Sequence, residues 1–509
     1  MTNSMNRYAT IAVVIVLAVA VSLFYSSLSF SQGANYQWQT LAGSEYRDSL
    51  VPLSYKGGYN NNIIVKWTYT MYNTQSAVGF SISSNPLVVD LDGDGANEVI
   101  ITDDAGELMI ISGKNGNLLL RTNVNASPFS TPYIIDVDND QTYEIFISTQ
   151  RGTIICYEIN PNGWTITKRW ESGVLGQMLP SSPLVYDVNG DGTYEVMVVS
   201  PSGFYTLNSL DGSIVTFVKH EFLVLGTSIT LAGDVDNDGV SEVVLADSYG
   251  LVMLVDPIYG NVQWTTDLSK SLKGFIIHSP AVGDVDGDGS GEVVISMGLE
   301  VFDWIPGTKS GQTSTGEKVA KRGVEGSIVI LDVHSGVIEA KITYNNGALF
   351  AWFSQPSMAL GDIDADGVKE IILGSGDGWL YLIDYNGNGY NVLKPVILDT
   401  KWSQYTDKDA PPVSSSVLLL DVNRDNKWEI IAFSTDDRNV GGRLDYTLYI
   451  IDSNLNVAGE LTITYGDLGI GSANSWIFSW PSLSAGDVDG DGVIEIVAIA
   501  YQGVICFDW

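Results

Sequence analysis

The stretch Asp90-Leu-Asp-Gly-Asp-Gly-Ala-Asn-Glu98 recurs in related form eight times in this chain of 509 residues. Each copy has an oxygen-bearing side chain at positions 1, 3, 5 and 9, and an apolar, β-rich stretch follows at once. A single acidic phrase of this kind could be no more than a polar turn. Eight copies in the same local context indicate instead that the chain is built from one repeated unit.

The residues at positions 1, 3, 5 and 9 are our candidate metal ligands, and they form eight sets. The sets are Asp90, Asp92, Asp94 and Glu98; Asp136, Asp138, Asp140 and Glu144; Asp187, Asn189, Asp191 and Glu195; Asp234, Asp236, Asp238 and Glu242; Asp284, Asp286, Asp288 and Glu292; Asp362, Asp364, Asp366 and Glu370; Asp421, Asn423, Asp425 and Glu429; and Asp487, Asp489, Asp491 and Glu495.

This spacing suits a hard cation such as calcium, which binds six to eight oxygen atoms within a tightly curled loop. Alternate side chains turn inward, the backbone carbonyl near position 7 supplies another ligand, and the glutamate closes the shell. The glycine at position 6 permits the left-handed backbone that the curl requires. We therefore predict up to eight calcium ions, with a structural role, because three or four carboxylates would otherwise repel one another.

Two of the eight loops depart from the pattern in ways that weaken a cation site. Gln141 replaces the glycine of the second loop and Asn426 that of the seventh. Asn tolerates the left-handed region better than Gln does. The seventh loop also contains Arg424 and Lys427, which repel a cation. We expect the second and seventh loops to bind calcium most weakly.

The rest of each repeat predicts four short antiparallel strands. One strand enters the acidic loop, one leaves it, a third follows a glycine and a fourth follows a further turn. The loops start between 46 and 78 residues apart. Four strands in a repeat of this size predict a β-propeller blade, so the fold class is all-β, with a calcium loop between the first and second strands of each blade.

The two ends of the chain complete one blade. After the eighth loop only two strands remain before Trp509, whereas one strand, from Ile63 to Tyr69, precedes the first loop. Pairing these ends would close the ring and protect its last edge. We predict eight blades within a domain of residues 61–509; seven blades and one irregular repeat are the alternative.

These loops resemble FG-GAP and VCBS repeats, as found in the β-propeller of integrin α subunits, over roughly residues 60 to 509. The chain differs from integrins in the glutamate at position 9 and in having acidic loops in nearly every blade. The resemblance implies an extracellular recognition or cell-adhesion module. It does not name the ligand.

Residues 1–31 predict export of the chain. Arg7 precedes an apolar run that extends to about Phe30, long enough to span a bilayer as a helix or to form a signal-peptide core. A small-x-small site at Ser29 to Ser31 would permit cleavage. We expect either a membrane anchor or a cleaved signal, then a linker over residues 32–60, with the remainder secreted or held at the cell surface.

Composition excludes some partners. The net charge is −35, and 30 of the 60 acidic residues stand at the loop positions. Nucleic acid and anionic membrane surfaces are poor partners for such a chain. Cys156 and Cys506 occupy equivalent places in two repeats that are not neighbours, so we expect buried apolar side chains rather than a disulfide.

The face opposite the acidic loops is the candidate binding face, for a protein or polysaccharide ligand. Aromatic and other large apolar residues are frequent in its connections, and the longest insertion, residues 303–325, adds basic residues. The alternative is that these aromatic residues fill the central channel and that the insertion is only a mobile loop. The residues are Phe129, Met178, Phe275, Phe350, Trp352, Phe353, Trp476, Phe478 and Trp480, with Lys309, Lys318, Lys321 and Arg322 in the insertion.

No catalytic arrangement stands out among the three histidines, of which His278 is nearest to this face. We therefore predict a non-catalytic recognition or adhesion module for protein or glycan. The alternative is a calcium-dependent polysaccharide lyase on an eight-bladed propeller, which could abstract a proton beside a uronate. Some phrases also resemble quinoprotein dehydrogenase propellers, but no cofactor pocket can be assigned.

Overall fold

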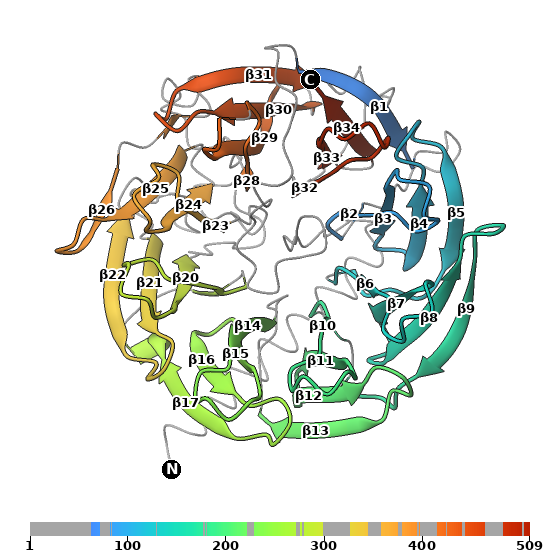
Figure 1. Ribbon diagram of the computed structural model, residues 1–509, viewed down its shortest axis with the longest axis horizontal. Coiled ribbons are helices and arrows are strands. Elements are labelled where there is room, and N and C mark those ends of the chain that lie inside the picture. Colours follow the sequence, from blue (N-terminus) through green and yellow to red (C-terminus); the bar gives the residue numbers. More distant parts are fainter. Residues whose placement is uncertain are drawn as a thin grey trace, which may run out of the picture.

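A computed structural model of the chain describes most of residues 63–509. The described residues are 63–71, 82, 84–128, 130–176, 179, 181–220, 229–270, 275–276, 279–298, 326–344, 358–374, 379–393, 396–397, 415–423, 425–439, 443–463, 482–500 and 503–509. Within them the secondary structure is all β, apart from one 3-10 turn, η1 (Leu268–Lys270). The strands form eight antiparallel sheets arranged as blades around a ring (Figure 1).

The first four blades follow the chain in order. Blade 1 contains β2 (Leu87–Val89), β3 (Glu98–Thr102), β4 (Glu107–Ile111) and β5 (Leu118–Asn123). Blade 2 contains β6 (Tyr133–Ile135), β7 (Tyr143–Ser148), β8 (Ile154–Asn160) and β9 (Thr165–Glu171). Blade 3 contains β10 (Leu184–Tyr186), β11 (Glu195–Ser200), β12 (Gly203–Asn208) and β13 (Ile214–Lys219). Blade 4 contains β14 (Ile229–Gly233), β15 (Glu242–Ala246), β16 (Leu251–Val255) and β17 (Val262–Asp267).

The second half repeats the plan with extra short strands in blades 5 and 6. Blade 5 contains β18 (Phe275–Ile276), β19 (Ala281–Gly283), β20 (Glu292–Gly298), β21 (Gly326–Asp332) and β22 (Ile338–Tyr344). Blade 6 contains β23 (Met358–Gly361), β24 (Glu370–Gly374), β25 (Trp379–Tyr385), β26 (Tyr390–Val392) and β27 (Val396–Ile397). Blade 7 contains β28 (Ser415–Leu420), β29 (Glu429–Asn439), β30 (Arg443–Ile451) and β31 (Val457–Ile463). Blade 8 contains β32 (Ser482–Gly486), β33 (Glu495–Ala500), β34 (Gly503–Asp508) and, from the other end of the chain, β1 (Ile64–Thr70).

The middle strands are apolar on both sides because each blade lies between two others. All five residues of β3 are buried, whereas β5, on the perimeter, contains only exposed and half-buried residues (Figure 1). Val99 and Ile101 pack in a cluster shared with blade 8, and Ile100 between them packs in a cluster shared with blade 2. Alternate side chains of one strand thus fill two interfaces, which explains the continuous β-branched runs in the sequence.

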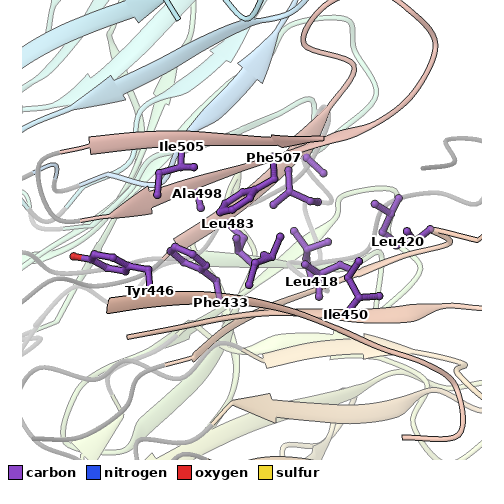
Figure 2. Close-up of a cluster of buried hydrophobic side chains, with 14 of the residues drawn as sticks. Leu418, Leu420, Phe433, Tyr446, Ile450, Leu483, Ala498, Ile505 and Phe507 are labelled. Carbon is purple, nitrogen blue, oxygen red and sulfur yellow. The ribbon is translucent and has the colours of Figure 1, made fainter. Parts of the chain in front are cut away.

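Figure 2 shows one of these interfaces, between blades 7 and 8. The rings of Phe433 and Tyr446 stack with centroids 5.7 Å apart, and Phe507 meets Phe433 edge-on at 6.0 Å. Since Phe507 belongs to β34 and the other two belong to β29 and β30, this aromatic cluster joins the last blade to the one before it.

The ring closes as the sequence predicts. β1 pairs with β34 in antiparallel register from Ile64 opposite Asp508 to Thr70 opposite Gly503. In Figure 1 these two strands lie side by side although they come from opposite ends of the chain. Eight blades are therefore confirmed, and the alternative of seven blades with an irregular repeat is wrong.

Tryptophans on the outer strands fasten three pairs of neighbouring blades. Each indole N–H donates to a backbone carbonyl in or beside the turn between the third and fourth strands of the next blade, and the ring lies against a glycine of that turn. The three bonds are Trp67 to Gly113 at 2.5 Å, Trp170 to Ser209 at 2.8 Å and Trp264 to Val333 at 2.8 Å.

Other predictions meet the structure only in part. Cys156 and Cys506 are buried and free, so the expectation of two apolar side chains instead of a disulfide is confirmed. Residues 1–31 and 32–60, predicted as signal or anchor and as linker, lie outside the described residues. Among the residues that are described, no helix is both long and apolar enough to cross a membrane.

We expect Trp67→Ala to lower the free energy of unfolding by about 3–5 kcal/mol, because it removes both the buried ring and its hydrogen bond. Trp264→Ala is the matched control. It breaks the same kind of contact, but between blades 4 and 5, which the chain also connects directly. Urea denaturation should therefore give similar losses. Limited proteolysis should differ, with faster cleavage near the termini in Trp67→Ala alone; equal protease resistance would mean that Trp67 does not hold the chain ends together.

Candidate metal centres

All eight acidic loops join the first and second strands of a blade, as predicted. Position 1 follows the first strand directly, as Asp90 follows β2, and position 9 lies at the start of the second, as Glu98 opens β3. Since the blades share one strand order, the loops gather on one face of the ring. Neighbouring loops touch there: the Asn97 N–H donates to the Asp487 carbonyl at 3.1 Å.

The backbone of the loops curls through left-handed residues at two positions. Position 6 has a positive φ throughout, including Gln141 at 71° and Asn426 at 65°, so the predicted left-handed backbone there is confirmed. Position 4 is left-handed as well in the seven loops where it is described, which the sequence pattern did not reveal; Ala365 adopts a φ of 66° there. Because side chains at these two positions are strained, glycine and asparagine are favoured at both.

Backbone N–H groups hold the aspartates in place, as the fourth loop shows. The Oδ1 atom of Asp234 accepts from the N–H of Asp238 at 3.0 Å, and its Oδ2 atom accepts from Gly239 at 3.1 Å. Asp238 Oδ1 accepts from Val240 at 2.9 Å. Each carboxylate oxygen has a second lone pair, so these bonds orient the aspartates and leave them able to bind a metal.

The glutamate at position 9 is buried in every loop. Its Oε2 atom accepts the N–H of position 2, at distances from 2.6 Å for Glu370 to 3.1 Å for Glu144. Glu242 and Glu370 are only 0% and 1% exposed, and their Oε1 atoms are buried without a hydrogen-bond partner. A buried carboxylate oxygen without a partner costs folding free energy, and a bound cation would remove that cost.

Electrostatics at the glutamates support the same conclusion. Burial, together with the charges of nearby aspartates, raises the pKa of Glu242 to about 7 and that of Glu370 to about 8, although a backbone hydrogen bond lowers both. For Glu292 the same causes raise the pKa to about 8. The ionised form of each glutamate is therefore disfavoured unless a positive charge lies beside it.

The carboxylates converge closely enough to share one ion. In the sixth loop, oxygens of Asp362, Asp364, Asp366 and Glu370 all lie within 4.8 Å of one another. In the first, second, fourth and fifth loops the converging group comprises positions 1, 3 and 9. Calcium binds oxygen at about 2.3–2.6 Å, so two ligand oxygens on opposite sides of one ion lie about twice that distance apart. The spacing of these carboxylate oxygens matches that separation. The residues fit a calcium ion, and the carbonyl ligand at position 7 stays a prediction.

In three loops a protein side chain meets the second oxygen of the glutamate. Arg169 Nη1 lies 2.7 Å from Glu144 Oε1, and Lys66 Nζ lies 3.2 Å from Glu495 Oε1. In the seventh loop the amide of Asn423 donates to Glu429 Oε1 at 2.8 Å. The second and seventh loops were predicted to be weak for other reasons, and the eighth was not. The missed signal is a basic residue directly before a tryptophan in the fourth strand of two repeats.

The candidate binding face stays a prediction. Among its predicted side chains, Phe275 stands in β18 but nothing is described of its side chain, and the rest, with His278 and the insertion of residues 303–325, lie outside the described residues. Arg424 of the seventh loop also lies outside them. His334 is described, and its Nδ1 atom lies 3.1 Å from the Val235 carbonyl, a structural contact at the edge of the fourth loop.

The fold and the loops define a class: an all-β, eight-bladed propeller with repeated acidic loops on one face. A family model described as outer membrane protein assembly factor BamB matches residues 58–215. Integrin alpha pat-2 of Caenorhabditis elegans is 26% identical over 152 residues, which are 29% of this chain and 12% of that protein. The chain thus spans about an eighth of that relative's length.

Two solved structures are similar to this chain at low sequence identity. The biofilm matrix protein Bap1 of V. cholerae superimposes with a TM-score of 0.49 and 13% identity, covering 88% of this chain and 91% of that one. Sqt1 of Saccharomyces cerevisiae gives a TM-score of 0.48 and 12% identity, covering 82% and 100%. Neither likeness bears on function.

We expect Glu242→Gln to raise the free energy of unfolding by about 1–3 kcal/mol when no divalent cation is present. The amide keeps the oxygen that accepts the Val235 N–H and replaces the unpartnered oxygen with a donor to the aspartates. Glu144→Gln is the matched control and should lose stability, since it removes the charge opposite Arg169. Urea denaturation in chelator measures both; a loss in Glu242→Gln would show that its carboxylate is already neutralised.

Proposed function

We propose that the acidic loops bind calcium and that calcium stabilises an extracellular recognition module. The observation that carries the proposal is the buried, unpartnered Oε1 atom of Glu242 and of Glu370, each beside converging aspartates. A bound cation would supply the missing partner for both atoms. It would also offset the repulsion within each loop.

The donor set favours calcium over other metals. Positions 1, 3, 5 and 9 offer only carboxylate and amide oxygens, without the histidine or cysteine that zinc prefers. Magnesium requires a small, near-ideal octahedron and retains its waters, whereas calcium accepts crowded and irregular oxygen shells. Extracellular calcium is abundant enough to fill loops of modest affinity, with Kd values of about 10⁻⁴–10⁻³ M.

The recognition role rests on the repeats and on the partial likeness to an integrin α chain. The acidic loops resemble FG-GAP repeats, and they use one face of the ring for metal. The opposite face is then available for a protein or polysaccharide ligand, and the apolar N-terminal segment would export or anchor the chain. A ring of eight interlocked blades is a rigid support for such a face.

Chelation should lower the melting temperature of the protein. Calcium at tenfold its Kd stabilises the fold by about 1.4 kcal/mol for each occupied loop, so removing it from several loops is a large loss. Asp284→Ala, which damages one loop, should cost less than chelation. Differential scanning calorimetry with and without chelator, with magnesium as the control ion, measures both. A melting temperature indifferent to chelator would refute the calcium proposal.

The ligand class is tested by retention on immobilised acidic and neutral polysaccharides in millimolar calcium, with the ultraviolet absorbance of unsaturated products followed in parallel. We expect retention without cleavage, since no catalytic arrangement can be read from the sequence. Cleavage would instead make the protein a polysaccharide lyase. Retention that neither chelator nor competing glycan abolishes would contradict a calcium-stabilised glycan site and point to nonspecific adsorption.

A further inference from the structure

One position recurs beside the acidic loops and is not part of them. The fourth strand of a blade contains a β-bulge, whose extra residue is skipped in the register with the third strand. In blade 8 the register passes from Val65 to Trp67 and skips Lys66, and in blade 2 it skips Arg169. Five further blades skip one residue each, whereas the described register of blade 6 shows no such skip. The five are Leu119 in blade 1, Val215 in blade 3, Gln263 in blade 4, Glu339 in blade 5 and Ala458 in blade 7.

In the two blades with a basic residue at this bulge position, the side chain enters the acidic loop of its own blade. Lys66 Nζ lies 2.5 Å from Asp489 and 3.2 Å from Glu495, at positions 3 and 9 of the eighth loop. Arg169 Nη1 lies 2.8 Å from Asp138 and 2.7 Å from Glu144, at the same two positions of the second loop. Lys66 and Arg169 thus make equivalent contacts in two copies of the repeat.

Blade 4 has an uncharged residue at the bulge position. The Gln263 side chain also reaches its loop, where Nε2 donates to Asp236 Oδ2 at 2.9 Å. It supplies no positive charge, and Oε1 of Glu242, which is 0% exposed, is left without a partner. The bulge position is therefore within reach of the loop, and the charge it carries differs from blade to blade.

We propose that Lys66 and Arg169 are tethered cations that take the place of calcium in the eighth and second loops. The inference rests on the proposed calcium sites of the other blades. Each basic group meets the two loop positions, 3 and 9, that also converge in the fourth and sixth loops. The residue at the bulge position thus sets which blades need the metal.

The energetics favour a tethered cation at these two loops. Glu144 and Glu495 have fully buried side chains, and the Lys66 and Arg169 side chains are only 17% and 27% exposed. Each basic group lies within 3.2 Å of two loop carboxylates, so its charge is paired on both. A calcium ion in the same loop would have to displace a positive charge already paired with two carboxylates.

The placement has a consequence for ring closure. Lys66 lies on β1, and its Nζ atom also lies 3.2 Å from Asp508 on β34, so one ammonium group joins both ends of the chain to the loop of blade 8. The blade assembled from the two termini is then fastened without calcium. Loss of calcium would weaken other blades and leave the closing seam intact.

The test counts calcium ions bound by the full chain, purified in mild detergent, using equilibrium dialysis against radioactive calcium. Lys66→Met and Arg169→Met should each bind about one additional ion per chain, since a vacated acidic loop becomes a calcium site. Gln263→Arg, the reciprocal change, should bind about one fewer. Lys114→Met is the control: Lys114 lies 2.5 Å from Asp94, is exposed and does not stand at the bulge, so the count should not change.

Unchanged counts in Arg169→Met and Gln263→Arg would overturn the inference, whether or not Lys66→Met folds. A gain in Lys114→Met equal to that in Arg169→Met would also overturn it, because net charge alone would then explain the result. Failure of the proposed calcium sites is distinguishable, since the unaltered protein would bind no calcium; if the variants also bound none, both proposals would fall.

Discussion

Each blade buries a glutamate carboxylate at the start of its second strand, directly beside two or three aspartates. One oxygen of that carboxylate accepts a backbone N–H and thereby fixes the curl of the loop, as Glu370 does with Ile363. The other oxygen needs a hydrogen-bond donor or a positive charge, because a buried anion without a partner is strongly disfavoured. The stability of the propeller therefore depends on how each blade neutralises this group.

The ring imposes the second constraint. The outer edge of β34 is covered only if the two ends of the chain pair, and here β1 pairs with it. Trp67 and Lys66 are adjacent on β1 and act on different neighbours: the indole binds blade 1, and the ammonium binds the loop of blade 8. One dipeptide thus joins blade 8 to blade 1 and ties the outer strand of blade 8 to that blade's own acidic loop.

The sequence predicted the architecture well, because the repeated unit carries local information. The acidic phrase, its glycines and the β-branched strands around it each specify structure within about ten residues, and the blade count followed from their order. Two features could not be predicted from the local sequence. Position 4 was missed because Ala365 and Asn237 hide its left-handed backbone, and Lys66 was missed because its partners lie more than 400 residues away along the chain.

By itself, then, the sequence determined that this protein is a β-propeller with acidic loops of metal-binding spacing, since strand alternation, turns and ligand spacing are short-range properties. Only the tertiary structure decided which loops contain an unpartnered carboxylate and which contain a basic side chain. That distinction depends on the fourth strand, which the blade brings beside a loop formed some 25 residues earlier or, in blade 8, at the other end of the chain. Charge neutralisation acts through space, so the partners of these carboxylates can be identified only in the folded chain.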